Sequence, residues 1–530
     1  MVSAAVALSR ITGLVRDMVF ARLFGAGLVY DAFVAAFRIP NLLRDLLAEG
    51  ALSSAFVTTF SQYMATKGDR EAFRLSNLVA TILTPAVAVL CLLGVLLAPQ
   101  LVDVMFPGFA EVAGKRELTI TLTRIMMPFL LFIALAAKAM GVLNARGVFG
   151  MPALASAFFN VGSILTGLGC GYWLGPAAGF SPIVGMAIGT LIGGVLQYVV
   201  QWPSLRRAGL RYRPELSFAD PGVRQIFRLM GPAVIGTAAV QVNVVVNSKF
   251  ASTLLDAAGR TANGPVSWLG FAFRLIQLPI GLFGVAIASA TLPAISRSAA
   301  ARNIPEFRST LASSLGLVFL LCLPSAVGLG LLGEPIVGVL FERGAFTAVD
   351  TRQTALALAG YALGLTGYAA IKVLTPAFYA LGDARVPMLA SLGSMAVNYA
   401  LNWTFLRVLG WGHAGLAVST SLVATVNFLA LMVFLRRRIQ RLEGRRLARS
   451  LSRIVAAVAV MGLACGASSW AAREWLGHSF WARLADLGVA IPLGVGVLYW
   501  LCRLLRVEEL DLARQAILGR ARVMMVRNEK

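Results

Sequence analysis

The sequence predicts an all-α polytopic membrane protein of about fourteen transmembrane helices, arranged as two pseudo-symmetric six-helix lobes plus two C-terminal helices. Three observations predict this class. Of the 530 residues, 58% are hydrophobic and only 13% are charged, whereas soluble domains carry about 25% charged residues. Apolar runs long enough to cross about 30 Å of hydrocarbon recur along the chain. Short motifs also repeat after about 235 residues, which indicates internal duplication.

The spans follow from the distribution of charge along the chain. Eleven are charge-free, and the long run Gly147–Leu205 contains two of them because GPAAGFSP divides it. The others are Asn77–Val102, Met230–Ser248, Leu275–Ser296, Ser309–Gly333, Gln353–Ile371, Val386–Leu406, Val408–Leu435, Ile454–Ala472 and Leu487–Cys502. Three further spans are apolar but carry charges: Met1–Phe24, Asp31–Thr66 and Leu118–Leu143.

The net charge of +23 is mostly explained by membrane topology. Most of the Lys and Arg residues fall in the loops after even-numbered spans and in the C-terminal tail, with the largest clusters at Arg206–Arg228, Arg436–Arg453 and Arg503–Lys530. Under the positive-inside rule these loops face the cytoplasm. We therefore expect a multi-pass membrane protein with both termini in the cytoplasm, and no nucleic-acid partner.

An internal repeat defines the expected lobes. The segment from Lys138 to Pro152 resembles the segment from Lys372 to Pro387, and Phe37-Arg38-Ile39 resembles Phe273-Arg274-Leu275. Six spans separate the members of each pair, so both copies have the same orientation in the membrane. We expect an N-lobe at 1–210 with spans 1–6, a C-lobe at 211–440 with spans 7–12, and a third segment at 441–530 with spans 13 and 14 and a basic cytoplasmic tail.

Several classes of function are disfavoured. Two histidines and five scattered cysteines provide neither a metal cage nor a disulfide framework. No GxxxxGK[ST] motif is present, which argues against ATP hydrolysis. We expect no metal, no cofactor and no catalytic residue, and hence no enzyme.

Ionisable residues inside spans are costly to insert and are functional candidates by default. Spans 1, 2 and 8 contribute Arg10, Arg16, Arg44 and Arg274, more arginines than nearby acids neutralise. Unpaired buried cations require an anionic ligand, and arginine suits bidentate contact with phosphate. The sequence predicts a central basic cavity for an amphiphilic phosphate- or carboxylate-bearing substrate.

Polar residues in two other spans suggest a second, weaker candidate site. Asn243 and Asn247 lie on span 7, and Asn398 and Asn402 are one helical turn apart on span 11. Their amide oxygens can bind Na⁺, although hydrogen bonds between helices explain them slightly better because no carboxylate accompanies them. Coupling of transport to Na⁺ or to the membrane potential is therefore an open alternative.

The stretch Ser9–Thr58 closely resembles the MurJ (MviN) family of lipid II flippases, matching SR, RD, FGAG, DAF, PNLLR and EGALSSAFV in order. Further matches are Gly231-Pro232, Phe273-Arg274-Leu275 and Phe341-Glu342-Arg343-Gly344-Ala345-Phe346, so the resemblance covers essentially the whole chain. It implies the multidrug/oligosaccharidyl-lipid/polysaccharide (MOP) exporter fold. By this resemblance the four arginines bind substrate, Asp31 and Glu49 are the functional acids, and helices at about 450–506 border a groove for the polyprenyl tail.

The resemblance implies a flippase that moves lipid II, the undecaprenyl-pyrophosphate-linked peptidoglycan precursor, across the inner membrane by alternating access for cell-wall synthesis. Membrane lipids and cell-wall synthesis proteins are further candidate partners. The leading alternative is a related flippase for another polyprenyl-linked oligosaccharide, or a drug exporter of the same fold. A membrane-embedded cell-wall enzyme or a scaffold is a weaker alternative, because the loops are short.

Overall fold

The computed structural model describes residues 2–46, 52–256, 258–440 and 443–515. Within these ranges the chain is helical, and the only β-type pairing is an isolated bridge between Leu255 and Thr261. The all-α class is therefore confirmed. The chain forms two compact units, Met1–Ser267 with Arg343–Phe346, and Trp268–Glu342 with Thr347–Lys530, which we call unit 1 and unit 2.

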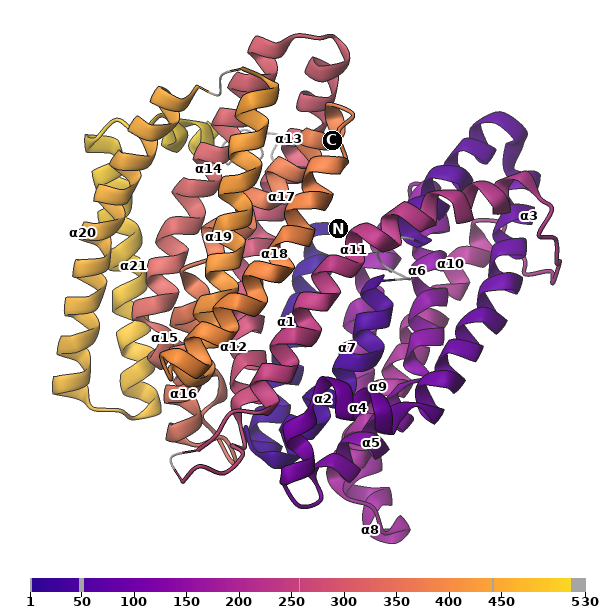
Figure 1. Ribbon diagram of the computed structural model, residues 1–530, viewed down its shortest axis with the longest axis horizontal. Coiled ribbons are helices and arrows are strands. Elements are labelled where there is room, and N and C mark those ends of the chain that lie inside the picture. The colour runs from indigo at the N-terminus through magenta and orange to yellow at the C-terminus, as the bar shows by residue number, and fades with distance from the viewer. Residues whose placement is uncertain (1, 47–51, 257, 441–442, 516–530) are drawn as a thin grey trace, which may run out of the picture. The chain divides into compact units, whose positions relative to one another are not determined.

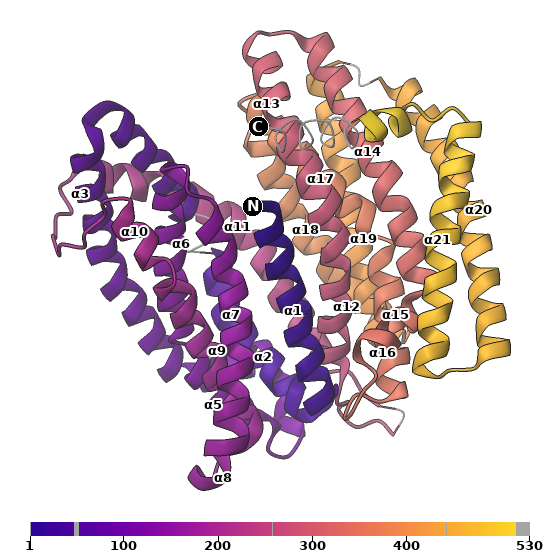
Figure 2. The same ribbon diagram turned by 180° about the vertical axis from the view of Figure 1, so that it is seen from behind.

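Unit 1 begins with α1 and contains the helices up to α11 (Figures 1 and 2). Its helices are α1 (Val2–Phe24), α2 (Leu28–Leu43), α3 (Ser53–Leu96), α4 (Ala98–Met105), the 3₁₀-helix η2 (Pro107–Glu111), α5 (Lys115–Met126), α6 (Phe129–Ala145), α7 (Gly150–Leu168), the π-helix η3 (Gly169–Leu174), α8 (Gly175–Ala178), α9 (Pro182–Val199), α10 (Trp202–Arg207) and α11 (Pro221–Ser252). Within α3 the chain turns at Gly68, which has a φ of 82°, so α3 is two helices.

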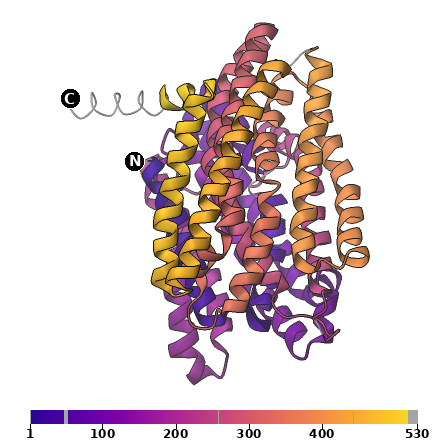
Figure 3. The same ribbon diagram turned by 90° about the vertical axis from the view of Figure 1, so that its left-hand side faces the viewer.

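Unit 2 starts in the first turn of α12 and ends with a C-terminal hairpin. Its helices are α12 (Pro265–Pro279), the π-helix η4 (Ile280–Gly284), α13 (Val285–Ala300), α14 (Ile304–Leu331), α15 (Gly333–Phe341), α16 (Ala348–Ala362), α17 (Leu365–Ala380), α18 (Arg385–Trp403), the π-helix η5 (Thr404–Val408), α19 (Gly412–Arg438), α20 (Gly444–Leu476) and α21 (Phe480–Leu504). The pair α20 and α21 runs side by side (Figure 3, yellow), and α20 also packs on α14.

The helix bounds repeat with the spacing that the sequence predicts. Adding 235 to the bounds of α7 gives 385 and 403, which are the bounds of α18. The part of α3 after Gly68 starts at 69 and ends at 96, and adding 235 gives 304 and 331, the bounds of α14. The π-helix η3 at 169–174 corresponds to η5 at 404–408, which begins 235 residues later and is one residue shorter. The two copies therefore share helix lengths and also irregularities, which supports the expected pseudo-symmetry.

Nine helices in the described ranges are long and apolar enough to cross a membrane, or ten if the bent pair α16–α17 is one span. The predicted spans that fall outside this set correspond to α1, α2, α11 and α18, which are short or carry charged or several polar side chains. The chain is a multi-pass membrane protein, while the number fourteen stays a prediction.

The boundary between the two units differs from the expected lobe boundary at residue 210. Helix α11 belongs to unit 1 because it packs on α3, where Gln225 Nε2 donates to Gln62 Oε1 at 3.0 Å. Its far end is also fixed there, since Arg38 of α2 donates to Ser248 Oγ at 2.9 Å. The segment at 441–530 packs within unit 2 as far as it is described. The division into lobes by sequence repeat stays a prediction.

Candidate functional site

Helix α7 fixes the position of α1, which carries two of the predicted arginines. Asn160 Nδ2 of α7 donates to the Ser9 carbonyl oxygen at 3.2 Å and to Thr12 Oγ1 at 3.3 Å. Asn160 itself is buried, so these bonds are shielded from solvent on the α7 side. Arg10 follows Ser9 directly and is exposed, and it makes no ion pair with any other described residue. The first predicted arginine is therefore free to meet an anion.

Arg16 lies deeper on α1 and is held from two sides. Its Nη2 donates to Asp17 Oδ1 at 3.2 Å, and the Arg16 side chain is 14% exposed. The guanidinium carbon also lies 5.4 Å from the centre of the Phe159 ring of α7, a cation–π arrangement. A neighbour in sequence and an aromatic face thus orient this guanidinium.

Arg44 lies at the C-terminal end of α2, where residues 44–46 form a π-turn. Its Nε and Nη2 donate to Asp45 Oδ1 at 3.0 and 2.8 Å. The Arg44 side chain is 27% exposed and that of Asp45 is 40% exposed, so the pair is accessible. Glu49, the other acid predicted for this region, lies outside the described residues.

Asp31 is the most completely coordinated of the predicted residues. Its carboxylate is fully buried and pairs with Lys115 Nζ at 2.9 Å. Oδ2 also accepts from the Gly264 amide at 2.8 Å, and Oδ1 accepts from the Ser267 amide at 2.8 Å and the Ser267 hydroxyl at 2.6 Å. Both oxygens therefore accept hydrogen bonds from protein donors. Asp31, which lies on α2, caps the N-terminal end of α12 by accepting from its first backbone amides.

Lys115 is the partner that the sequence analysis missed. The residue is fully buried at the start of α5. Besides Asp31, its ammonium donates to Asn263 Oδ1 at 2.9 Å and lies 4.2 Å from the centre of the Phe109 ring. In the sequence Lys115 is one basic residue in an ordinary loop, next to Arg116, and no local signal separates it from a solvated charge.

The adjacent Arg116 shows the contrast with an exposed pair. Its Nε and Nη2 donate to Asp103 of α4 at 2.7 Å each. These hydrogen bonds, before any other cause, lower the pKa of the Asp103 carboxyl below its usual value. Both side chains are partly exposed, so this pair orients the start of α5 from outside the core.

A loop from later in the chain completes this end of unit 1. Residues Arg343–Phe346 belong to unit 1, and the Ala345 amide donates to the Arg22 carbonyl oxygen at 2.9 Å. Gly25, with a φ of 62°, makes the turn after α1, and a Cβ there would lie 2.4 Å from the Ala345 carbonyl oxygen. The α1–α2 turn is thus closely packed against this loop, and only glycine fits.

Arg274 lies in unit 2, which is described by itself. It is exposed on α12, while Phe273 before it packs on Tyr361 with ring centres 5.3 Å apart. The structure brings Arg10, Arg16 and Arg44 into one unit and leaves Arg274 in the other. Lys372, the expected repeat equivalent of Lys138, is exposed, whereas Lys138 is buried in α6.

The four predicted asparagines are also divided between the two units. On α18, Asn402 Nδ2 donates to Asn398 Oδ1 at 3.1 Å, and both side chains are buried. Asn243 and Asn247 lie on α11 in unit 1. No cluster of three or more His, Cys, Asp or Glu suited to a metal ion occurs in the part of the chain that the structure describes. A Na⁺ site at these amides stays a prediction.

The C-terminal hairpin, expected to border the tail groove, is anchored by charged groups at one end. Arg473 of α20 pairs with Glu334 at 3.3 Å, and Arg483 of α21 pairs with Glu342 at 2.7 Å. Along the rest of the hairpin, large apolar side chains are exposed, including Leu463, Val489 and Val495. The hairpin therefore presents a hydrocarbon surface and is fixed to α15 and its following loop by ion pairs.

Comparison with known proteins gives a consistent result across sequence and structure. A profile described as lipid II flippase MurJ matches residues 20–485. A probable lipid II flippase MurJ of Vibrio cholerae is 36% identical over 522 residues, covering 96% of each chain. A lipid II flippase MurJ of Burkholderia cenocepacia is 36% identical over 441 residues, covering 82% of this chain and 83% of the relative.

Solved structures show the same fold. A lipid II flippase MurJ in an inward closed conformation aligns with a TM-score of 0.75 at 25% identity, covering 95% of this chain and 98% of that one. An inward-facing multidrug resistance MATE transporter of the MOP superfamily aligns with a TM-score of 0.68 at 16% identity, covering 82% of this chain and 96% of that one. The predicted exporter fold is confirmed.

Proposed function

The chain belongs to the lipid II flippase MurJ family, and from that membership we propose that it translocates lipid II across the bacterial inner membrane by alternating access. The cargo combines a polyprenyl tail, which stays in hydrocarbon, with a pyrophosphate and a polar glycopeptide, which must cross. The protein supplies a polar path for the head group, and its role is transport without a catalytic step.

The observation that carries this proposal is the presence of three arginines, Arg10, Arg16 and Arg44, on the first two helices of unit 1. Arg16 pairs with Asp17 and Arg44 pairs with Asp45, while Arg10 is exposed and makes no ion pair with another described residue. Asp31 is already neutralised by Lys115. Three guanidinium groups thus lie in one unit, and arginine is the side chain best suited to a pyrophosphate. Arg274, in unit 2, is proposed as a further substrate-binding residue.

A drug exporter of the same fold is the second candidate, and the MATE transporters support it by fold. The sign of the charge argues against it. Cationic drugs would require acids at the site, whereas its exposed or partly exposed ionisable side chains are predominantly arginines. The same arginines would also suit another polyprenyl-linked oligosaccharide. Family membership is therefore the ground on which lipid II is proposed as the cargo.

The energy source is proposed to include the membrane potential. Each elementary charge that crosses the full potential gains or loses about 2.3 kcal/mol per 100 mV. With the interior negative, outward movement of an anionic head group is favoured, and so is the inward return of an empty cationic site. Na⁺ bound by the asparagines of α11 and α18 is the alternative driving ion.

Complementation tests the function directly. We expect the chain to restore viability to a bacterium depleted of its own lipid II flippase, and we expect Arg10→Ala, Arg16→Ala, Arg44→Ala or Arg274→Ala to abolish the rescue. Arg22→Ala is the matched control, because Arg22 is an exposed arginine on the same helix as Arg10 and Arg16. Full rescue by all four variants at normal membrane levels would contradict the role of the arginines.

A further inference from the structure

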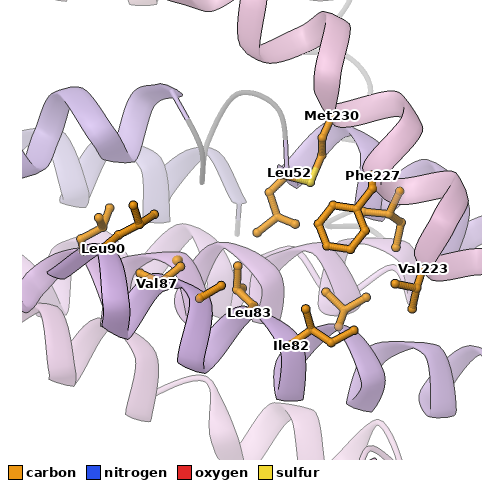
Figure 4. A pocket seen from close by; sticks show the side chains of 13 residues that line it. Leu52, Ile82, Leu83, Val87, Leu90, Val223, Phe227 and Met230 are labelled. Carbon is orange, nitrogen blue, oxygen red and sulfur yellow. The ribbon is translucent and has the colours of Figure 1, made fainter. Parts of the chain in front are cut away.

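An apolar cavity of about 150 Å³ lies within unit 1, apart from the arginines and from the C-terminal hairpin. Its walls come from α3, α6 and α11 and from Leu52, which directly precedes α3. Figure 4 shows Leu83 of α3 and Met230 of α11 at the cavity. Among the described residues, all thirteen lining side chains are hydrocarbon or thioether, and none of them turns a polar atom toward the space. The cavity therefore offers nothing to water or to a polar ligand.

The mouth of the cavity is marked by two residues. Among the lining side chains only Ala86 of α3 and Phe227 of α11 are exposed, and Phe227 is 51% exposed. Beyond Ala86 the surface of α3 continues with exposed Val89 and Leu93. Since α3 is among the most apolar spans of the chain, this opening adjoins a surface suited to the hydrocarbon of the membrane.

A void of this size is costly for a protein, because its lining loses dispersion contacts. Apolar cavities of about this volume stay free of water and take up small hydrocarbons. In a membrane the nearest hydrocarbon is a lipid acyl chain. The cavity shape and lining thus point to an acyl chain as the occupant.

Charge beside the mouth indicates the head group. Arg224 and Arg228 follow the lining residues Val223 and Phe227 directly on α11. Both are exposed, and neither makes an ion pair with another described residue. On a helix each lies about 100° from the residue before it, on the same side as the exposed Phe227 and away from the buried Ile226. Basic residues flanking an apolar cleft at the membrane surface recognise anionic lipid.

The depth of the cavity matches one leaflet. Helix α11 starts at Pro221 with Asp220 as its N-cap, and Met230 is nine residues further along. At about 1.5 Å per residue, the lining extends about 14 Å from the polar start of α11. A lipid whose phosphate lies at Arg224 and Arg228 can therefore place the first part of one acyl chain in the cavity.

We propose that the cavity between α3, α6 and α11 binds an anionic phospholipid, with one acyl chain inside and the phosphate on Arg224 and Arg228. The bound lipid joins α11 to α3 and α6, so it stabilises unit 1 without taking part in cargo movement. The site is separate from the arginines of α1 and α2, and it holds a membrane lipid rather than the transported one.

Native mass spectrometry of the purified full chain, delipidated in detergent, tests the proposal with two probes of identical acyl chains, phosphatidylglycerol and phosphatidylcholine. We expect phosphatidylglycerol to bind about thirtyfold more tightly than phosphatidylcholine, because two arginines at about 1 kcal/mol each contribute about 2 kcal/mol. Arg224→Gln combined with Arg228→Gln should remove this preference. The pair Arg206→Gln and Arg207→Gln, also exposed in unit 1, should keep it.

A cavity-filling variant tests the acyl chain. Ala86→Phe should weaken phosphatidylglycerol binding at least fivefold, while Ala88→Phe, at an exposed alanine outside the lining, should not. Equal effects of the two substitutions, or no preference for phosphatidylglycerol in the parent chain, would overturn the proposal. Tighter binding of undecaprenyl phosphate in competition would assign the cavity to the cargo tail instead. If Ala86→Phe fails to fold, the arginine pair and the two probes decide the question.

Discussion

At the residue scale, the charges in the first two helices have different roles despite similar settings in the sequence. The Asp31 carboxylate forms an ion pair with Lys115 and accepts hydrogen bonds from the start of α12. By contrast, Arg10 is exposed and Arg44 is accessible. A buried carboxylate with four donors has a structural role, because no further ligand can reach it without breaking existing hydrogen bonds. The candidate binding groups are therefore the arginines, and Asp31 acts on them through the position of α2.

The Lys115–Asp31 pair gives the first prediction. Lys115→Met leaves Asp31 buried with its charge unpaired, and removing one partner of a buried pair costs about 3–5 kcal/mol. We expect a clear fall in the thermal unfolding temperature of the purified protein. Asp31→Asn combined with Lys115→Met should recover part of the loss, because no uncompensated charge remains.

The control for this prediction is the neighbouring residue. Arg116→Met removes a pair whose Arg116 side chain is 30% exposed, and exposed pairs contribute about 0–1 kcal/mol. If the Lys115→Met variant is as stable as the Arg116→Met variant, the buried Lys115–Asp31 pair does not stabilise the fold.

At the element scale, close packing between helices depends on glycine. Helices α7 and α9 run side by side (Figures 1 and 2). Gly189 and Gly193 of α9 face α7, and Gly185 faces η3, which continues α7. A Cβ at Gly189 would lie 2.4 Å from the Gly167 backbone, and one at Gly185 would lie 2.2 Å from the Gly171 nitrogen. Small residues at such spacing let two helix backbones approach closely in lipid.

A second prediction follows from this contact. Gly189→Val requires backbone displacement, and overpacking costs about 1–3 kcal/mol, so the yield of folded protein in gel filtration should fall. Gly169→Ala is the control, because no atom lies within 4 Å of a Cβ there. If both variants behave like the parent chain, the two helices are not held together by this glycine contact.

The turn between α1 and α2 gives a third prediction at the same scale. Gly25→Ala adds a Cβ against the Ala345 carbonyl oxygen at a φ of 62°. Gly114→Ala has a similar backbone cost at a φ of 73° but open space, so it isolates the contact from the conformational strain of about 1–2 kcal/mol. We expect Gly25→Ala to lose complementation and thermal stability well beyond Gly114→Ala. Equal losses would mean that the Arg343–Phe346 loop does not depend on this turn.

At the scale of the whole molecule, the repeat copies backbone irregularities as well as helices. The π-turn at residues 44–46 and the π-helix η4 at Ile280–Gly284 are 236 residues apart, since 44 plus 236 is 280. The pair η3 and η5 is 235 residues apart. π-segments are rare and recur at functional positions, so their duplication indicates that each lobe bends at equivalent points.

The orientation in the membrane is the prediction at this scale. With the five native cysteines replaced, a single cysteine at Arg213 should react with a membrane-impermeant thiol reagent only after the cells are opened. A single cysteine at Ala178, between α7 and α9, should react in intact cells. The reverse pattern would contradict the expected cytoplasmic position of both termini, which rests on the clusters of basic residues.

How far the sequence predicts the fold can be seen from the spans. Long apolar runs with basic flanks identify α14, α19, α20 and α21 without ambiguity, because the insertion energy of a span is a sum over its own residues. The spans that are not apolar enough to be recognised in this way, α1, α2, α11 and α18, carry most of the candidate site residues. Polar side chains in a span must face something other than lipid. For that reason the spans of low hydropathy are the ones that carry the candidate site residues.

Composition, periodicity and motifs are local properties of the chain, so they were enough to predict the class, the repeat and the family, and to propose the arginines as binding residues. The tertiary structure decided which charges are already paired. Lys115 is 84 residues from Asp31, and Gly264 and Ser267 are more than 230 residues from it. It also decided that α11 packs with unit 1 and leaves an apolar cavity beside α3. Burial and pairing depend on contacts distant in sequence, and only the folded chain brings these residues together.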